Sequence, residues 1–242
     1  MSHWFDFHVG DFTILDLIAA TTNAFNAALL VRRPDHWRHY TVVGVLLLGV
    51  IGGIAGGVSR DLLLLQSPAP LLNPLYLVLT LAAAGLAMTI DYRSGQRFRE
   101  GLFQFATSLS LPWYAAIGAG KALDAKLPYL TAVLIGVVGA TTGRYIVDLT
   151  SGVTPKLFIR GEWYVGTAVL TGVVYVACAA GLGWSAWPAT LAAFGVGFVF
   201  RYAALLRHWE EPEPWMPDPL RAGERARPQI QDQVREEFRG DA

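Results

Sequence analysis

Long stretches without charge dominate the pattern along the chain. Residues 40–59, 71–90, 101–120 and 127–143 contain no Asp, Glu, Lys or Arg, and neither do residues 163–200. About 20 apolar helical residues cross the hydrocarbon core of a bilayer, so the last stretch is long enough for two crossings. Residues near 12–31 form a further, more polar candidate span. The pattern therefore predicts an all-α membrane protein with seven spans. They lie near 12–31, 40–58, 72–91, 101–120, 128–148, 163–183 and 186–206.

Composition agrees with a membrane domain over residues 1–207. The chain is 53% hydrophobic and 16% charged, whereas soluble domains carry roughly 25% charged residues. The segment 208–242 differs, because its residues are mostly prolines, acids, arginines and small polar groups. Such a segment buries too little apolar surface to fold, so we expect a disordered tail, with a docking peptide as the alternative. The formal net charge is zero, which argues against nucleic-acid binding.

Basic residues in the short loops predict the orientation. Loops on one side carry only Lys121 and Lys126, whereas the loops at 32–38, 93–99 and 156–160 on the other side are richer in Arg and Lys. Cytoplasmic loops carry the excess of Lys and Arg. We therefore expect a multi-pass protein of the cell membrane with its N-terminus outside and its C-terminus in the cytoplasm.

A repeated sequence links the two halves of the chain. GVIGGIAGGVSRDLLLLQSP, residues 49–68, aligns without gaps with GVVGATTGRYIVDLTSGVTP, residues 136–155. The identical positions include glycines and also an Asp, a Leu and a Pro behind them. The repeated unit is three spans long, and its two copies cover about 12–91 and 101–183. Because three is an odd number, the second copy enters the membrane from the face opposite to the first. The sequence thus predicts two inverted repeats and a seventh helix, a plan common in transport proteins.

The repeated glycines allow two interpretations. Glycine lets helices approach closely in lipid. Several glycines together also weaken a helix, so the second and fifth spans are predicted to kink here and to expose carbonyl oxygens to an ion pathway. We expect that pathway to be lined by these residues and by polar neighbours: Gly52, Gly53, Gly56, Gly57, Ser59, Arg60, Asp61, Gly139, Thr142, Gly143, Arg144 and Asp148.

Charges inside the spans should be paired or face water, because an isolated charge in the bilayer is costly. Arg144 and Asp148 are four residues apart and are expected to pair on one helix face. Arg60 and Asp61 are adjacent and are not expected to pair with each other. Asp61 is instead expected to lie near the fifth span and Asp148 near the second, either as structural anchors or in direct contact with ions.

Three further charged residues have two interpretations each. Asp16 either lines water or packs against the other repeat. Lys121 is either an anchor that reaches the membrane surface or a contact for gating or for lipid. Arg201 is expected to be a surface anchor of the same kind as Lys121.

Residues 52–64, GGIAGGVSRDLLL, resemble the Gly-rich Arg-Asp motif of the bacterial trimeric intracellular cation (TRIC) channel family. The resemblance spans roughly residues 12–206. It implies a homotrimer with a pore for monovalent cations, chiefly potassium, in each protomer, lined by kinked second and fifth spans. The motif residues are Gly56, Gly57, Arg60 and Asp61 in the first copy, and Gly139, Gly143 and Asp148 in the second. Some bacterial relatives are glycine transporters, so a carrier of a small amino acid is the alternative.

No enzyme motif, cofactor site or tightly bound metal site is visible, and the histidines lie in terminal or loop segments. The sequence therefore favours a cation channel, then a secondary transporter of a small amino acid such as glycine. A membrane scaffold whose tail binds a partner is the third possibility.

Removing residues 215–242 is expected to leave transport intact, because the predicted pathway lies entirely within the spans. The measurement is the conductance of purified truncated and full-length protein in planar bilayers. Loss of activity in a truncated protein that still inserts would support the scaffold instead.

Overall fold

The computed structural model describes residues 13–33, 35–90, 96–155, 157–159, 161 and 163–212. These residues form helices and no strand. The elements are α1 (Thr13–Leu30), α2 (Val42–Leu63), α3 (Ala69–Leu72), α4 (Leu75–Thr89), α5 (Gln96–Asp124), α6 (Tyr129–Thr150), α7 (Tyr164–Val176), a π-helical turn η1 (Ala177–Gly181) and α8 (Ala186–Leu206). Most of the predicted tail, from residue 213 onward, lies outside the described residues.

A helix occupies each of the seven predicted segments, with two differences in detail. Helix α5 begins at Gln96 and is longer than its predicted span, and the short helix α3 lies between α2 and α4. Among the described helices, four are long and apolar enough to cross a membrane: α2, α6, α7 with η1, and α8. Helices α1 and α4 are apolar but shorter. The described part of the chain is thus all-helical, and the arrangement as two inverted repeats stays a prediction.

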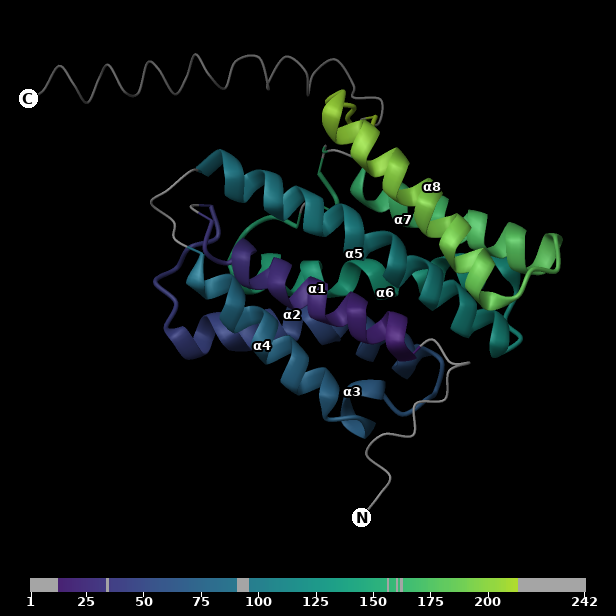
Figure 1. Cartoon of the computed structure of the whole chain (residues 1–242), viewed down its shortest axis with the longest axis horizontal. Helices are drawn as coiled ribbons and strands as arrows, with labels where there is room; N and C mark the ends of the chain where they lie inside the picture. The colour runs from purple at the N-terminus through teal and green to yellow at the C-terminus, as the bar shows by residue number, and fades with distance from the viewer. Residues whose placement is uncertain are drawn as a thin grey trace, which may run out of the picture. The chain divides into compact units, whose positions relative to one another are not determined.

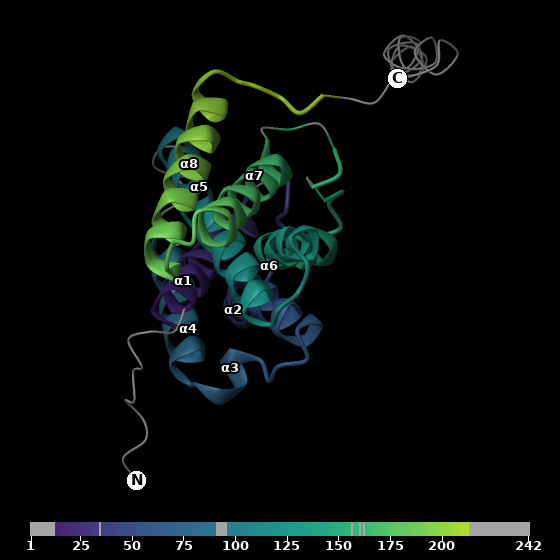
Figure 2. The same ribbon diagram turned by 90° about the vertical axis from the view of Figure 1, so that its right-hand side faces the viewer.

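Helices α2 and α6 pack against each other. Helix α1 packs against α2, α4 and α5, whereas α5 packs against α6, α7 and α8 (Figure 1). Figure 2 shows α8 running beside α5 and α7, away from α2. Helices α2 and α6 therefore lie where groups from both halves of the chain meet.

The surface of the bundle is apolar and its interior is rich in small residues. Large hydrophobic side chains are exposed along α4 and α8, including Val78, Leu86 and Val199. Buried alanines and glycines instead fill the contacts between helices. This inside-out pattern suits a protein surrounded by lipid, where close packing of small residues holds helices together.

The two glycine-rich helices end in the same way. After α2, Leu65 has a φ of 56° and the amide of Gln66 donates to the carbonyl of Asp61 at 2.9 Å. After α6, Gly152 has a φ of 65° and the amide of Val153 donates to the carbonyl of Asp148 at 3.0 Å. Left-handed residues with such hydrogen bonds end many helices. The similarity of residues 49–68 and 136–155 therefore extends to their backbone conformation.

The glycines bring the backbones of α2 and α6 into direct contact. A Cβ on Gly56 would overlap the carbonyl oxygen of Gly139, and a Cβ on Gly143 would overlap the carbonyl oxygen of Gly52. The two contacts are equivalent under the repeat, and together they show that the helices are antiparallel here. Both helices continue through these glycines without a break, so the close-packing interpretation is correct at this contact. The kinks stay a prediction.

Gly56→Ala is expected to destabilise the protein by about 1–3 kcal/mol, the usual cost of forcing an extra methyl group into a packed contact. Gly195→Ala in α8 is the matched control, because a Cβ there meets no atom within 4 Å. The measurement is the thermal unfolding midpoint of the purified variants in detergent. Equal midpoints for both variants would contradict the close contact between α2 and α6.

Candidate functional site

The first cluster of buried charges lies at the C-terminal end of α2, and we call it the Arg60 cluster: Asp16, Arg60, Asp61, Tyr76 and Lys121. The guanidinium of Arg60 is fully buried and binds both carboxylate oxygens of Asp16, at 2.9 and 2.8 Å. Its Nε donates to Asp61 Oδ1 at 2.8 Å. Such forked hydrogen bonds to carboxylates are strong and directional.

Two further side chains complete the Arg60 cluster. Lys121 Nζ donates to Asp61 Oδ1 at 3.2 Å and lies 3.5 Å from Asp16 Oδ2. The hydroxyl of Tyr76 donates to Asp16 Oδ2 at 3.2 Å. The cluster holds two acids and two bases, so its formal charge is zero. It connects α1, α2, α4 and α5, and the other oxygen of Asp61 accepts from the amide of Ala69 at the start of α3.

This geometry corrects two predictions. Arg60 and Asp61 do pair, because the long Arg side chain bends back to its neighbour while its outer nitrogens reach Asp16. Lys121 is not a surface anchor: its amino group turns inward to the two carboxylates. Asp16 is 2% exposed and packs in the interior, which agrees with the packing interpretation.

The second cluster lies at the C-terminal end of α6, and we call it the Arg144 cluster: His36, Arg144 and Asp148. Arg144 Nε donates to Asp148 Oδ1 at 2.7 Å, which confirms the predicted pair. Nε2 of His36 lies 2.9 Å from the same oxygen. Both His36 and Asp148 are fully buried. The loop between α1 and α2 is thereby connected to the end of α6.

The two acids have reciprocal partners across the repeat. Asp61 of the first unit contacts Lys121 at the end of α5, and Asp148 of the second unit contacts His36 after α1. In each case the acid near the end of the second helix of one predicted unit meets a base of the other unit, Lys121 within its first helix or His36 in the loop after it. The expected proximity of Asp61 to the fifth span and of Asp148 to the second span stays a prediction.

Sequence reasoning missed His36, because it was set aside with the other loop histidines. Its position offers no signal from the repeat, since the corresponding residue, 87 positions on, is Leu123. Only the fold brings the loop against α6.

The remaining predicted pathway residues lie on α2 and α6, outside the direct contact of the glycine backbones. Gly53 packs against α1, where a Cβ would come within 2.8 Å of the carbonyl oxygen of Ala20, and its own carbonyl accepts from the hydroxyl of Tyr114 at 2.6 Å. Gly57 leaves room beside Arg60 and that ring. The other two, Ser59 on α2 and Thr142 on α6, are half-buried.

The hydroxyl of Thr142 donates to the carbonyl of Val138 at 2.7 Å, within its own helix. Its hydrogen is therefore engaged, and only its oxygen lone pairs are open to another ligand. A role of these residues in ion passage stays a prediction.

The prediction that Arg201 is a surface anchor is wrong. The side chain is 4% exposed, and its guanidinium carbon lies 5.4 Å from the centre of the Tyr164 ring. A cation over an aromatic face is stabilised by the charge distribution of the ring. Cys178 is buried and forms no disulfide.

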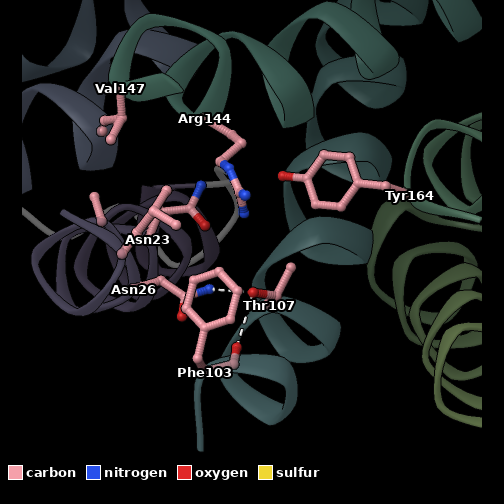
Figure 3. Close-up of a pocket in the computed structure, with 10 residues that line it drawn as sticks. Asn23, Asn26, Phe103, Thr107, Arg144, Val147 and Tyr164 are labelled. Atoms are coloured by element: carbon pink, nitrogen blue, oxygen red, sulfur yellow. Dashed lines mark hydrogen bonds between the residues drawn. The ribbon is translucent and has the colours of Figure 1, made fainter. Parts of the chain in front are cut away.

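A partly open pocket adjoins the Arg144 cluster. It lies between α1, α2, α5, α6 and α7, so residues from both predicted repeats surround it. Figure 3 shows the polar side chains of Asn23, Arg144, Thr107 and Tyr164 around one space. The described residues contain no group of three His, Cys, Asp or Glu side chains arranged to hold a metal.

Asp16→Asn is expected to destabilise the protein by about 3–5 kcal/mol, because removal of one charge leaves a buried partner uncompensated. Asp124→Asn, at the exposed end of α5, is the matched control and is expected to change stability by less than about 1 kcal/mol. The measurement is the unfolding free energy in detergent with increasing denaturant. An Asp16→Asn variant as stable as the control would contradict the bonding of the Arg60 cluster.

Sequence comparisons place this chain in a known family. The family model described as glycine transporter matches residues 13–92 and 104–180, in register with the two predicted repeats. An Escherichia coli protein, the UPF0126 inner membrane protein YadS, is 26% identical over 201 residues, which cover 82% of this chain and 93% of the relative. A UPF0126 membrane protein from Deinococcus radiodurans is 33% identical over 65% of this chain and 71% of the relative.

Structural comparisons give the same fold as TRIC channels. The Rhodobacter sphaeroides TRIC orthologue has a TM-score of 0.72 at 27% identity and covers 81% of this chain and 97% of its own. A second TRIC cation channel structure has a TM-score of 0.73 at 26% identity, over 85% of this chain and 98% of its own. The resemblance drawn from the Gly-rich motif is thus confirmed, and the channel relatives indicate a non-enzymatic membrane protein. The chain belongs to the glycine transporter family and has the fold of the bacterial TRIC channels.

Proposed function

We propose that this protein is a monovalent cation channel whose pathway follows the contact between α2 and α6. Each protomer of a homotrimer contains one pathway, and potassium is the main permeant ion. The structure corresponds to the closed state, because backbone contacts fill the path at the glycines. Similarity to TRIC channels over more than four-fifths of the chain supports this function.

The observation that carries the proposal is the glycine contact itself. No side chain separates the backbones where Gly56 meets Gly139 and Gly143 meets Gly52. The carbonyl oxygens of Gly52 and Gly139 face the opposite helix, and carbonyl oxygens are suitable ligands for a partly dehydrated potassium ion. A small separation of the helices would line a path with these oxygens.

The charge clusters suit the two ends of such a path. The Arg60 cluster lies beyond the contact toward the end of α2, and the Arg144 cluster lies beyond it toward the end of α6. Asp61 and Asp148 supply negative charge at equivalent positions, and Arg60 and Arg144 neutralise it in the closed state. Opening therefore requires the ion pairs to rearrange or the helices to separate between them. By the distribution of loop charges, the Arg144 cluster faces the cytoplasm.

A glycine carrier is the second candidate, favoured by two observations. The matching family model is described as glycine transporter. The pocket also lies on one side of the glycine contact only, next to Arg144. A carrier with alternating access needs a solute site with a barrier on one side at a time. The same contact between α2 and α6 would then be the barrier.

Purified full-length protein in planar bilayers separates the two functions. A channel gives discrete single-channel currents, and in a potassium chloride gradient the reversal potential follows potassium and not chloride. A carrier gives saturable glycine uptake into proteoliposomes without discrete currents. A protein with neither activity would leave only the scaffold interpretation.

Gly56→Leu and Gly143→Leu are expected to abolish either activity in protein that still inserts, because a large side chain cannot fit between the touching backbones. Gly195→Leu in α8 is the control, since no atom lies near a Cβ there. The readout is the potassium current, or glycine uptake, per inserted protein. Full activity in both α2 and α6 variants would refute a pathway at this contact.

A further inference from the structure

The pocket beside the Arg144 cluster is lined mainly by uncharged side chains. Ten of the described residues line it, and of these ten Arg144 alone has a formal charge. The rest are polar uncharged or apolar: Asn23, Asn26, Ala27, Leu30, Gly52, Phe103, Thr107, Val147 and Tyr164. Among the described residues, no carboxylate lines the space. A bare cation would therefore find no negative ligand there, whereas an anionic group could accept hydrogen bonds from the guanidinium of Arg144.

The guanidinium of Arg144 is oriented toward the pocket. Its Nε is engaged with Asp148, which also contacts buried His36. The guanidinium carbon of Arg144, Cζ, lies 5.4 Å from the centre of the Phe103 ring. Figure 3 shows the outer nitrogens between the amide of Asn23 and the hydroxyl of Tyr164. The side chain is thus held from behind, and its two outer nitrogens are presented to the space.

The surrounding polar groups suit a small ligand that carries both a carboxylate and an ammonium group. A planar guanidinium fork matches the two oxygens of a carboxylate. The hydroxyl of Tyr164 is a further donor on the same side, and the amide oxygen of Asn23 is an acceptor for an ammonium group. Asn26 and Thr107 are hydrogen-bonded to each other at 2.6 Å and form a fixed polar wall. Leu30, Val147 and the Phe103 ring bound the space and leave little room for a large side chain.

We propose that this pocket binds a small α-amino acid through its carboxylate, which is held by the outer nitrogens of Arg144 and the hydroxyl of Tyr164. Asp148 and His36 are positioning residues that orient Arg144. The inference rests on the carrier proposed as the second function, for which it names the substrate site. It is tested by binding alone, so that it can fail or hold independently of any transport measurement.

The test is isothermal titration of the full-length protein in detergent with glycine, acetate and methylamine. Glycine is expected to bind, acetate to compete with it, and methylamine, which lacks the carboxylate, not to compete. Arg144→Gln is expected to weaken glycine binding by about tenfold or more, because hydrogen bonds to a charged group are lost. Arg38→Gln is the matched control, since Arg38 lies in the exposed loop before α2 and does not line the pocket.

Tyr164→Phe provides a second variant in case Arg144→Gln does not fold. It removes one donor and is expected to weaken glycine binding by about threefold to tenfold. Competition by methylamine or potassium chloride and not by acetate would overturn the proposal, as would unchanged affinity in the folded Arg144→Gln or Tyr164→Phe protein. Absence of glycine binding together with Arg144-dependent binding of anionic lipid vesicles would also overturn it, in favour of a lipid headgroup site.

Glycine binding that depends on Arg144 without uptake in proteoliposomes would uphold this site and refute the carrier. Potassium currents without glycine binding would refute the site and uphold the channel. The two proposals are therefore distinguishable.

Discussion

The arrangement of this protein depends on the contact of two helix backbones inside a membrane. Lipid supplies no hydrophobic force between helices, so their association depends on close packing and internal polar bonds. Gly56 and Gly143 supply the packing, because each lacks the Cβ that would hold α2 and α6 apart, and they meet the carbonyl oxygens of Gly139 and Gly52. The contact is tight, and no side chains interlock between the two backbones. In the proposed function it closes the path, and the two helices separate there on opening.

The second constraint is the cost of charge in a membrane. Each glycine-rich helix ends in an acid and carries an arginine nearby, and the fold neutralises them in two separate clusters. The Arg60 cluster joins four helices through ion pairs and hydrogen bonds. The Arg144 cluster borders a pocket, so its arginine has both a structural partner and an open side. The similar segments 49–68 and 136–155 thus end with similar backbones and different chemistry.

The positions of the helices were predictable from the sequence, and the bonding inside the clusters was only partly so. Charge-free stretches locate the helices because the bilayer forces apolar residues into runs, and the repeat identified α2 and α6 as the equivalent pair. The pair of Arg144 and Asp148 follows from helical spacing alone. The contact of Arg60 with Asp61 was missed because spacing rules ignore how far an arginine side chain bends. The roles of Lys121, His36 and Arg201 depend on helices distant in sequence, which a linear pattern does not specify.

The central claim is that the glycine contact between α2 and α6 is the barrier between the two sides of the membrane. The most direct measurement is the labelling of Asn23→Cys, in the pocket, in a protein whose own cysteine is replaced by Cys178→Ser. A membrane-impermeant thiol reagent is added to one face or the other of sealed proteoliposomes with uniformly oriented protein. The account predicts that the resting protein reacts from one face only, the face nearer the Arg144 cluster. Labelling at equal rates from both faces would contradict it.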